Sequence, residues 1–585
     1  MKELKHLNKY FLKYKRDLLI GIVITIVARI FLLYTPRYVK RIFEVVEKYN
    51  AGLNTGDRTI QGELAEIILY IIGAAIIAGI LTFFMRQTII NVSRYIEYDL
   101  KNEIYDHYQK LSLNFYKKNR TGDLMNRISE DVGRVRMYAG PAIMYSINTA
   151  ALFIIAIAYM FNEAPLLTIY TILPLPILSF AIYKLSKEIH KRSTIVQEYL
   201  SKLSSFAQET FSGISVIKAY GLETQTSTNF DELSTENKEK QIHLVSVEAL
   251  FFPMMILLIG VSNLLVIYIG GKQYMSGEIK SIGTIAEFII YVNMLTWPVA
   301  TVGWVTSIVQ QAEASQKRIN EFLTIEPEIT NTVSNHTEVI GNITFNNVFF
   351  TYDDTNIQAL KGVSFTLKAG ETLAILGKTG SGKSTILELI GRLYDIDEGS
   401  ILIDGIEIKN HNLDDLRNSI GYVPQDAFLF SDTIKNNIKF GKEDATDADV
   451  IAAAKKAHVH KNIVKFNLGY DTVLGERGIT LSGGQKQRIS IARAIIKSPK
   501  ILLFDDCLSA VDTETEEKIL RNLHEITSNK TTILVSHRVS STKNADKIIV
   551  LEDGKIVQEG NHESLINTDG YYQHLYLKQL SETTN

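Results

Sequence analysis

The amino-acid sequence predicts two domains of different fold class: an all-α transmembrane domain of six helices, followed by an α/β domain. The chain has 585 residues, which is too long for one compact domain. Its apolar residues, 46% of the total, are unevenly distributed. Long apolar runs crowd roughly the first 310 residues, whereas the remainder alternates between strand-like and helix-like patterns. The long runs predict the first domain, and the alternation predicts the second.

Charge and cysteine content narrow the class of protein. With 62 basic and 64 acidic residues, the net charge is −2, so the sequence gives no reason to expect a nucleic-acid partner. The single cysteine, Cys507, excludes a disulfide within the chain and fits a reducing compartment.

The first domain is predicted from helices long enough to cross a bilayer. A hydrocarbon core about 30 Å thick needs roughly 20 helical residues. The clearest run, 250–271, contains no charged residue. Six candidate spans cover approximately residues 17–36, 64–90, 138–161, 165–186, 248–271 and 283–308.

The N-terminus is expected to lie in the cytoplasm. Several basic residues precede the first apolar run, and such a bias keeps a segment on the cytoplasmic side. No small-residue cleavage site follows, so this run is interpreted as a retained span. Six crossings return the second domain to the cytoplasm. The expected location is the cell membrane, as a multi-pass protein of a bacterial inner membrane.

Two inward-facing segments, 91–137 and 187–247, are long, polar and helical in pattern. Each contains a helix-breaking glycine within an amphipathic stretch, at 115–132 and 209–223. Taken alone, each glycine indicates only a turn between helices. Segments of this length let the spanning helices continue past the membrane toward a cytoplasmic partner.

The second domain contains a phosphate-binding loop. The sequence GKTGSGKS, residues 377–384, follows an apolar strand and precedes a helical pattern, as the GxxxxGK[ST] motif requires. We expect its backbone N–H groups and the Lys383 ammonium to hold ATP, and the Ser384 hydroxyl to hold Mg²⁺. The sequence therefore predicts an α/β P-loop nucleotide-binding domain. The predicted nucleotide ligands are Gly377, Lys378, Thr379, Gly380, Ser381, Gly382, Lys383, Ser384 and Thr385.

A second apolar strand, ILLF, ends in two adjacent carboxylates. Asp505 is the expected ligand of the same Mg²⁺, because a carboxylate at the end of a buried parallel strand is how such domains hold the metal. Asp506 is either a working general base or a position where catalysis is weakened. The strand pattern alone does not decide between these two readings.

Polar residues at three other positions are candidates for nucleotide contacts. Gln425 and His537 each follow an apolar strand and could contact the γ-phosphate or the attacking water; Gln425 is also a candidate metal ligand. Tyr352, upstream of the phosphate loop, could stack on adenine. The alternatives are a turn for Gln425, a strand-end cap for His537 and a core position for Tyr352.

The motif LSGGQ, residues 481–485, provides a second anion-binding site. Exposed N–H groups at the start of its helical run would bind phosphate. Because the chain already has one phosphate loop, this second site makes sense if LSGGQ faces the nucleotide of another copy. The predicted ligands here are Ser482, Gly483, Gly484 and Gln485.

Together these motifs resemble the ABC exporter half-transporters of the multidrug and lipid exporter group. The motifs stand in the family order, and the resemblance covers about residues 10–578. It implies that two ABC ATPase cassettes enclose two ATP molecules, each between one phosphate loop and the other cassette's LSGGQ. It also implies that the two glycine-broken segments are coupling helices that dock on the cassettes. Residues 475–478 resemble the segment that senses those helices, and Asp512 is expected to reach across to the other cassette.

The sequence departs from the family at Asp506, where the family has a glutamate that polarises the attacking water. Aspartate is one methylene shorter, which draws its carboxylate back by roughly 1.5 Å. A misplacement of about 1 Å can cost about a hundredfold in rate, so we expect this site to bind ATP and Mg²⁺ but to hydrolyse slowly. Two assemblies stay open: a heterodimer whose partner supplies the competent site, and a slow homodimer. The intact LSGGQ fits the heterodimer, whereas the retained His537 complicates it.

The resemblance implies ATP-driven export of an amphipathic or hydrophobic compound, such as a drug, lipid or peptide-like molecule, by alternating access. The alternatives are an ATP-binding regulatory half with little hydrolysis at its own site, and an ATP-gated channel. The expected partners are a second half-transporter and the lipid bilayer. The predicted boundaries are 1–316 for the transmembrane domain, 317–340 for a linker, 341–578 for the cassette and 579–585 for a tail.

Overall fold

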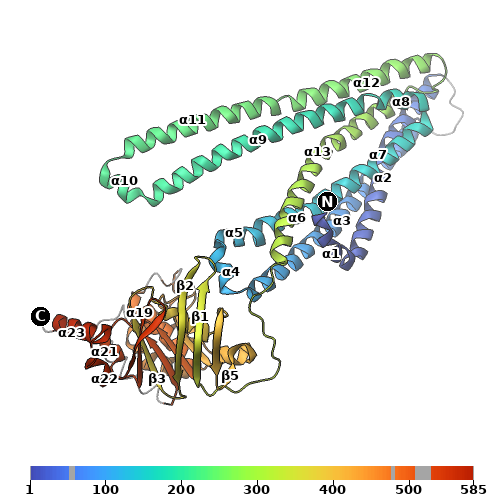
Figure 1. Ribbon diagram of the computed structural model, residues 1–585. Helices are drawn as coiled ribbons and strands as arrows, with labels where there is room; N and C mark the ends of the chain where they lie inside the picture. Colours follow the sequence, from blue (N-terminus) through green and yellow to red (C-terminus); the bar gives the residue numbers. More distant parts are fainter. Residues whose placement is uncertain (1, 52–59, 476–477, 479–480, 508–528, 584–585) are drawn as a thin grey trace. The chain divides into compact units, whose positions relative to one another are not determined.

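The computed structural model describes residues 2–51, 60–475, 478, 481–507 and 529–583. The chain divides into two compact units (Figure 1). The first unit contains Met1–His107 and Gly122–Ile325, and the second contains Tyr108–Thr121 and Glu326–Asn585. Each unit is described separately below.

The regular elements that the structure describes in the first unit are all helices. Its apolar stretches form long helices because every backbone N–H and C=O in such a stretch can pair within its own helix, which a lipid environment requires. The helical elements are η1 (Glu3–Leu7), α1 (Asn8–Lys13), α2 (Lys15–Asn50), α3 (Ile60–Lys110), α5 (Thr121–Asn126), α6 (Val132–Met137), α7 (Ile143–Glu163), α8 (Pro165–Ile172), α9 (Pro174–Ser212), α10 (Ile214–Tyr220), α11 (Glu223–Glu248), α12 (Phe251–Met275) and α13 (Gly283–Leu323). Two π-helical stretches, η2 (Arg127–Asp131) and η3 (Tyr138–Ala142), flank α6.

Five helical runs among the described residues are long and apolar enough to cross a membrane. They contain five of the six predicted spans: Lys15–Asn50, Ile60–Lys110, Thr121–Glu163, Glu223–Met275 and Gly283–Leu323. The fourth predicted span, 165–186, is not among them. It falls on α8 and α9, which are separate helices because Pro174 begins the second one, and α9 becomes lysine-containing from Lys184 onward. A sixth crossing therefore stays a prediction.

The second inward segment forms a long hairpin. Helices α9 and α11 lie side by side, and the short α10 closes their far end (Figure 1). Gly213 ends α9, and Gly221 ends α10 in a left-handed conformation with a φ of 65°. The predicted break in 209–223 is therefore present, at two glycines, and Gly221 adopts the left-handed geometry that favours glycine at a helix end.

The first inward segment breaks at a different residue from the one expected. Helix α4 (Leu113–Lys118) is followed by Asn119 in an extended conformation, and α5 then begins at Thr121. Gly122 lies inside the first turn of α5, where glycine is tolerated, so the glycine is not the helix breaker.

The second unit is built on two sheets. A four-stranded antiparallel sheet has the order β2-β1-β4-β5, and a six-stranded sheet has the order β10-β9-β3-β8-β7-β6. In the larger sheet β9, β3, β8, β7 and β6 are parallel, and only β10 is antiparallel. The strands are β1 (Ile343–Tyr352), β2 (Ile357–Leu367), β3 (Thr372–Gly377), β4 (Glu398–Ile403), β5 (Ile406–Glu407), β6 (Ile420–Val423), β7 (Ile501–Asp505), β8 (Thr531–Val535), β9 (Lys547–Glu552) and β10 (Lys555–Gly560).

Helices cover both faces of the larger sheet. The helical elements of this unit are α4, α14 (Lys383–Ile390), η4 (Ile408–Asn410), α15 (Leu413–Asn418), α16 (Ile434–Lys439), α17 (Asp447–Lys456), α18 (His460–Ile463), η5 (Gly469–Asp471), α19 (Gly483–Ile496), α21 (Val539–Thr542), α22 (His562–Ile566) and α23 (Tyr571–Thr583). Along β7, Leu503 packs with α14 in one buried cluster, whereas Leu502 and Phe504 pack with α19 in another. Since neighbouring residues of a strand point to opposite faces, α14 and α19 cover opposite faces of the sheet.

Two predicted boundaries differ from the structure. Helix α13 continues to Leu323, so residues 317–323 are helix and not linker. Helix α23 runs from Tyr571 to Thr583, so the predicted tail begins inside a helix. In α13, Ile319 and Phe322 are buried at helical spacing, so residues 317–323 continue the packed face of that helix.

Candidate functional site

Four neighbouring parallel strands end at one edge of the larger sheet, and each carries a predicted site residue there. The phosphate loop follows β3, His537 follows β8, Asp505 ends β7, and Gln425 follows β6. Ligands of open α/β sheets bind at the carboxyl ends of the strands. The sheet order, which the sequence alone does not reveal, thus brings these predicted residues to one edge.

The phosphate loop connects β3 to α14 in a conformation that needs glycine. Gly382, the N-cap of α14, has a φ of 98°, and a Cβ there would lie 2.5 Å from the carbonyl oxygen of Ala359. The Lys383 ammonium donates hydrogen bonds to the carbonyl oxygens of Gly377 and Lys378, at 3.0 and 2.8 Å. Burial lowers the pKa of Lys383, and the charges of Asp506 and Asp505 oppose that shift.

The remaining loop residues divide by exposure. Lys378, Thr379 and Gly380 are exposed at the tip, whereas Ser381 and Thr385 are buried. Among the described residues, the Ser381 hydroxyl is a buried polar atom without a hydrogen-bond partner. A loop with exposed N–H groups at its tip, a buried ammonium and an unsatisfied hydroxyl fits a polyphosphate group.

A hydroxyl and a carboxylate meet next to this loop. The Ser384 hydroxyl donates a hydrogen bond to Asp505 Oδ1 at 3.0 Å. Asp505 is buried, and burial raises its pKa, as do the nearby charges of Asp506 and Glu388. Hard oxygen ligands of this kind suit Mg²⁺, which takes one or two from the protein and the rest from phosphate and water. The described residues contain no group of three His, Cys, Asp or Glu side chains able to hold a metal ion.

Asp506 stands where β7 ends. Its backbone is left-handed, with a φ of 41°, and its N–H donates to the carbonyl oxygen of Val535 at 3.0 Å, which ties the residue to β8. The side chain is buried and interacts electrostatically with Lys383 and His537. A non-glycine residue with positive φ is strained by about 1–3 kcal/mol, and such strain gathers at functional sites.

His537 is half-buried on the loop after β8. Burial and the charge of Lys383 lower its pKa, whereas the charge of Asp506 raises it. The Gln579 side chain holds this loop: its amide nitrogen donates to the carbonyl oxygen of His537 at 3.0 Å, and its amide oxygen accepts from the N–H of Val539 at 2.9 Å. Gln579 could not be selected from sequence patterns, because the contact joins residues about 40 positions apart.

Tyr352 comes from the smaller sheet, at the end of β1. Its hydroxyl is hydrogen-bonded to Thr385 Oγ1 at 2.9 Å and donates to Glu388 Oε2 at 2.8 Å, so the ring is anchored to α14 beside the phosphate loop. The ring also makes edge contacts with Phe350 and Tyr394. A role in stacking on adenine stays a prediction.

LSGGQ is the start of α19. Ser482 is the N-cap, and it forms a capping box with Gln485: the Ser482 N–H donates to the Gln485 side chain at 2.9 Å, and the Gln485 N–H donates to the Ser482 hydroxyl at 3.3 Å. Ser482 and Gly483 are exposed. The helix end is therefore ordered and accessible, on the opposite face of the sheet from α14. Asp512, Glu476 and Arg477, to which the sequence also assigned roles, lie outside the described residues.

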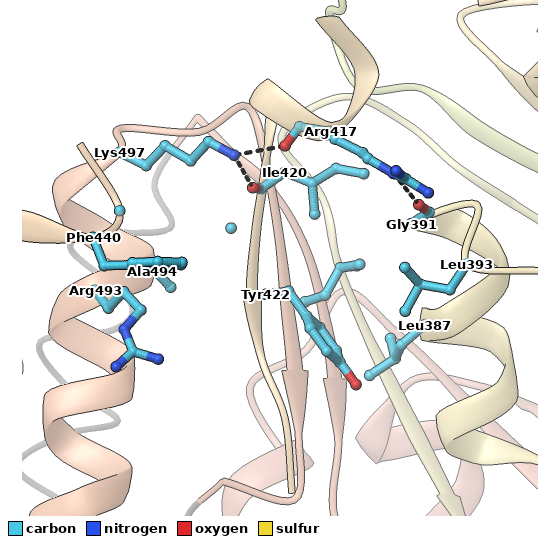
Figure 2. A pocket seen from close by; sticks show the side chains of 13 residues that line it. Leu387, Gly391, Leu393, Arg417, Ile420, Tyr422, Phe440, Arg493, Ala494 and Lys497 are labelled. Carbon is cyan, nitrogen blue, oxygen red and sulfur yellow. Dashed lines mark hydrogen bonds between the residues drawn. The ribbon is translucent and has the colours of Figure 1, made fainter. Parts of the chain in front are cut away.

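A cavity of about 270 Å³ opens beside the edge strand β6 (Figure 2). Its apolar lining comes from α14, β6 and α19, and includes Leu387, Tyr422 and Ala494. Three cations complete the lining: Arg417, Arg493 and Lys497. They donate mostly to backbone carbonyl oxygens; burial lowers the pKa of each and brings that of Arg493 to about 10. No acidic side chain is among the described residues that line this groove, which we call the β6 groove.

Two family models match this chain. The ABC transporter transmembrane region matches residues 18–299, and the ABC transporter model matches residues 360–509. This chain belongs to the ABC transporter family. The match confirms both the resemblance and the fold class predicted from the sequence: a helical transmembrane domain followed by an α/β nucleotide-binding domain.

Similar ABC transporters cover almost the whole chain. "Probable multidrug resistance ABC transporter ATP-binding/permease protein YheI" of Bacillus subtilis is 36% identical over 579 residues, 98% of this chain and 97% of that protein. The ATP-dependent lipid A-core flippase of Syntrophus aciditrophicus is 36% identical over 527 residues, 89% of this chain and 85% of that protein. The solved structure of a bacterial Atm1-family ABC exporter with ATP bound has a TM-score of 0.79 at 27% identity, and the match covers 96% of this chain and 99% of that one. This chain is thus a multi-pass membrane ABC transporter that binds ATP and couples its hydrolysis to transport.

Proposed function

We propose that this ABC transporter exports an amphipathic or hydrophobic compound, as one half of a dimer, with its N-terminus and cassette in the cytoplasm of a bacterial cell. The observation that carries the proposal is that one chain combines apolar helices of membrane length with a sheet edge that brings together the phosphate loop, Asp505, Gln425 and His537. The names of its relatives, a multidrug resistance protein and a lipid A-core flippase, support an amphipathic substrate.

The dimer follows from the positions of the two anion-binding helix ends. Phosphate binds at the N-terminus of α14, and the LSGGQ end of α19 belongs to a helix on the opposite face of the sheet. One ATP cannot reach both ends within a single cassette. Each LSGGQ therefore completes the site of the other half, so that closure of the two cassettes depends on bound ATP.

Helix α10 would transmit the closure of the cassettes to the transmembrane helices. Its end of the hairpin is apolar and uncovered in the single chain: Phe211 is 74% exposed and Tyr220 is 76% exposed. The β6 groove offers an apolar floor and three cations, and α10 is flanked by Glu209 and Glu223. We expect α10 of the other half to occupy this groove as a coupling helix.

The positions of these residues at the sheet edge support the following roles. Lys383 would hold the phosphates, and Ser384 and Asp505 would hold Mg²⁺, whose charge would neutralise the charge that develops on the phosphates. Gln425 and His537 contact the γ-phosphate or the attacking water, and Asp506 occupies the position of the general base. Because its carboxylate is one methylene short, this site turns over slowly. The same observation favours a second candidate function, an ATP-binding regulatory half whose partner carries the faster site.

Vesicle transport tests the main proposal. In inside-out vesicles carrying the full chain, we expect ATP, but not ADP, to drive accumulation of a fluorescent amphipathic dye or a labelled lipid. Lys383→Ala should abolish accumulation, because the phosphates lose their buried cation. Movement that persists without ATP, or in Lys383→Ala, would contradict export and favour a passive or channel-like path.

ATPase assays test the slow site. Asp506→Glu should raise the ATPase rate by about tenfold to a hundredfold, because the carboxylate then reaches the attacking water. Asp506→Asn is the matched control and should not gain activity. If the unmodified chain alone already turns over rapidly and loses this activity with Lys383→Ala, the slow-site proposal is wrong.

A further inference from the structure

The first coupling segment, α4, is attached to the cassette of its own chain. Asn114 donates to Glu328 and to Asp353, at 2.9 and 3.0 Å, and Ser112 donates to Glu328 at 2.6 Å. Lys118 pairs with Asp353 at 3.7 Å. These contacts fix α4 next to Asp353, which directly follows Tyr352 at the end of β1.

Lys117, on the same helix, lies over two tyrosine rings. Its ammonium is 4.6 Å from the ring centre of Tyr352 and 4.9 Å from that of Tyr394. Among the described residues no carboxylate forms an ion pair with Lys117. The ammonium thus has the geometry of a cation–π contact with both rings, and its charge also acts on the Tyr394 hydroxyl.

The ring of Tyr352 cannot easily turn away from Lys117. Its hydroxyl is hydrogen-bonded to Thr385 and Glu388, and its edge contacts Phe350 and Tyr394. With the ring fixed in this way, the Lys117 ammonium lies over one of its faces, and a base stacked on that face would have to take its place.

We propose that Lys117 competes with the adenine base for the face of Tyr352, so that base stacking displaces Lys117 and loosens α4 on its cassette. This inference rests on the proposed role of Tyr352 in adenine stacking. The displaced segment is continuous with α3 on one side and α5 on the other, both of which belong to apolar helical runs. A base bound at Tyr352 would thus act on the membrane domain through the covalent continuity of α4 with these helical runs.

Competition has a signature that simple charge attraction lacks. A lysine that only attracts polyphosphate helps every polyphosphate ligand, and its removal weakens all of them. A lysine that blocks the base position opposes only ligands that carry a base. Removal of the charge should therefore tighten the binding of ATP and leave inorganic tripolyphosphate unaffected.

Binding to the full-length chain in lipid nanodiscs tests this prediction. Lys117→Met should tighten ATP binding about two- to fivefold, which corresponds to a partly exposed cation–π contact, with no change for tripolyphosphate. Lys118→Met is the matched control: it removes the neighbouring charge without touching the rings, and should change neither. Lys117→Arg keeps the cation–π contact and should bind ATP like the unmodified chain. Weaker or unchanged ATP binding in Lys117→Met, or an equal effect on both ligands, would overturn the competition.

Tyr352→Leu separates this inference from the role of Tyr352 itself. It should weaken ATP binding but not tripolyphosphate binding, and in its background Lys117→Met should have no further effect. If Tyr352→Leu leaves ATP binding intact, the stacking role fails. If Tyr352→Leu weakens ATP binding but Lys117→Met still has its full effect in that background, the stacking role stands and the competition fails.

Discussion

At the scale of single residues, the site is an arrangement of neighbouring charges. Lys383 begins α14, Asp505 ends β7 with Asp506 directly after it, and His537 follows β8; the charges of Lys383 and Asp506 act on the pKa values of both Asp505 and His537. The buried ammonium favours neutral His537, and the carboxylate of Asp506 favours the protonated form. Neutral His537 keeps one ring nitrogen as a hydrogen-bond acceptor, which a contact with the attacking water requires.

The pKa of His537 should respond in opposite directions to two substitutions. It should lie below the ordinary value of about 6.5, rise in Lys383→Met and fall further in Asp506→Asn. Because the folded pKa is depressed, the unfolded chain binds more protons, and His537 should cost stability as the pH falls from about 6.5 through the lower folded value. Histidine-labelled NMR of the full chain measures the midpoint, and the loss of one resonance in His537→Gln assigns it. A shift of the same sign in both variants would contradict this arrangement.

Two glycines of the phosphate loop form a matched pair. Gly382→Ala should abolish ATP binding, because a Cβ would lie 2.5 Å from the backbone oxygen of Ala359 and the φ of 98° is left-handed. Gly380→Ala meets open space at a φ of 81°, so it should add only the strain of about 1–2 kcal/mol and weaken binding far less. Titration with labelled ATP measures both. Equal losses would show that the space around the loop does not decide which glycine is required.

At the scale of elements, the residue that caps α19 also has a proposed role in ATP binding. Ser482 caps the helix, and its exposed end is the proposed contact for the other half's ATP. Ser482→Ala should lower the free energy of unfolding by about 1 kcal/mol. Ser482→Asp should keep the cap, because aspartate is an equally good N-cap, but should repel the triphosphate and block ATP-dependent closure. Thermal unfolding and ATPase rates distinguish the two effects. An active Ser482→Asp variant would show that LSGGQ does not contact the triphosphate.

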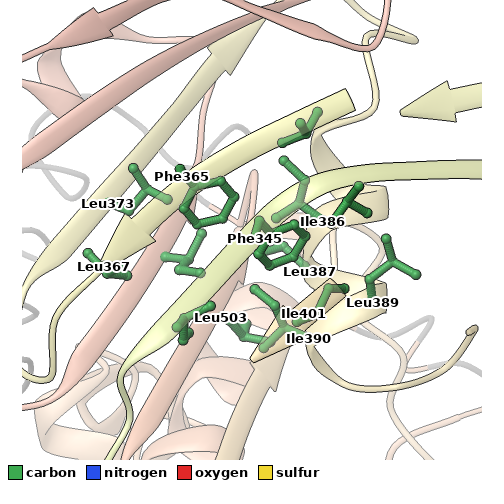
Figure 3. Packing of buried hydrophobic residues seen from close by; sticks show 14 of the residues in the cluster. Phe345, Phe365, Leu367, Leu373, Ile386, Leu387, Leu389, Ile390, Ile401 and Leu503 are labelled. Atoms are coloured by element: carbon green, nitrogen blue, oxygen red, sulfur yellow. The ribbon is translucent and has the colours of Figure 1, made fainter. Parts of the chain in front are cut away.

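The core that places α14 on the sheet gives another prediction at this scale. Figure 3 shows Leu503 of β7 among Leu387, Ile390 and Ile401, all buried. Leu503→Ala should destabilise the cassette by about 2–5 kcal/mol, because a fully buried leucine leaves a cavity. Leu577→Ala, at a site that is 55% exposed, is the control and should cost about 0.5 kcal/mol or less. Denaturant unfolding measures both changes, and similar values would contradict the assigned packing.

Local patterns predicted some of these elements, and long-range contacts decided the others. The phosphate loop and LSGGQ were predictable because strand, loop and helix adjoin in the sequence. The fourth span was not found as one helix, because Pro174 divides it. The attachment of α4 to the cassette had no local signal: Asn114 and Asp353 are 239 positions apart. The same holds for Gln579, whose contact with the His537 loop makes the supposed tail a part of the site.

At the scale of the whole molecule, the two candidate assemblies differ in what surrounds each ATP. In a homodimer, both sites carry Asp506 and an intact LSGGQ. In a heterodimer, this chain's LSGGQ completes the partner's site, and Asp506 belongs only to its own. The face-to-face arrangement can be tested by cross-linking because the only native cysteine, Cys507, is buried, and buried thiols react poorly.

A double variant, Lys378→Cys with Ser482→Cys, should discriminate between these assemblies. Lys378 lies at the exposed tip of the phosphate loop, and Ser482 lies at the exposed start of α19 on the opposite face of the sheet. In a homodimer, oxidation in the presence of ATP should give a disulfide-linked species of twice the chain mass, absent from either single variant. In an obligate heterodimer, the purified chain alone should give no such species, and it should form only when the partner carries one of the two cysteines. A disulfide within one chain would contradict the separation of the two helix ends, and with it the reason for expecting two cassettes around each ATP.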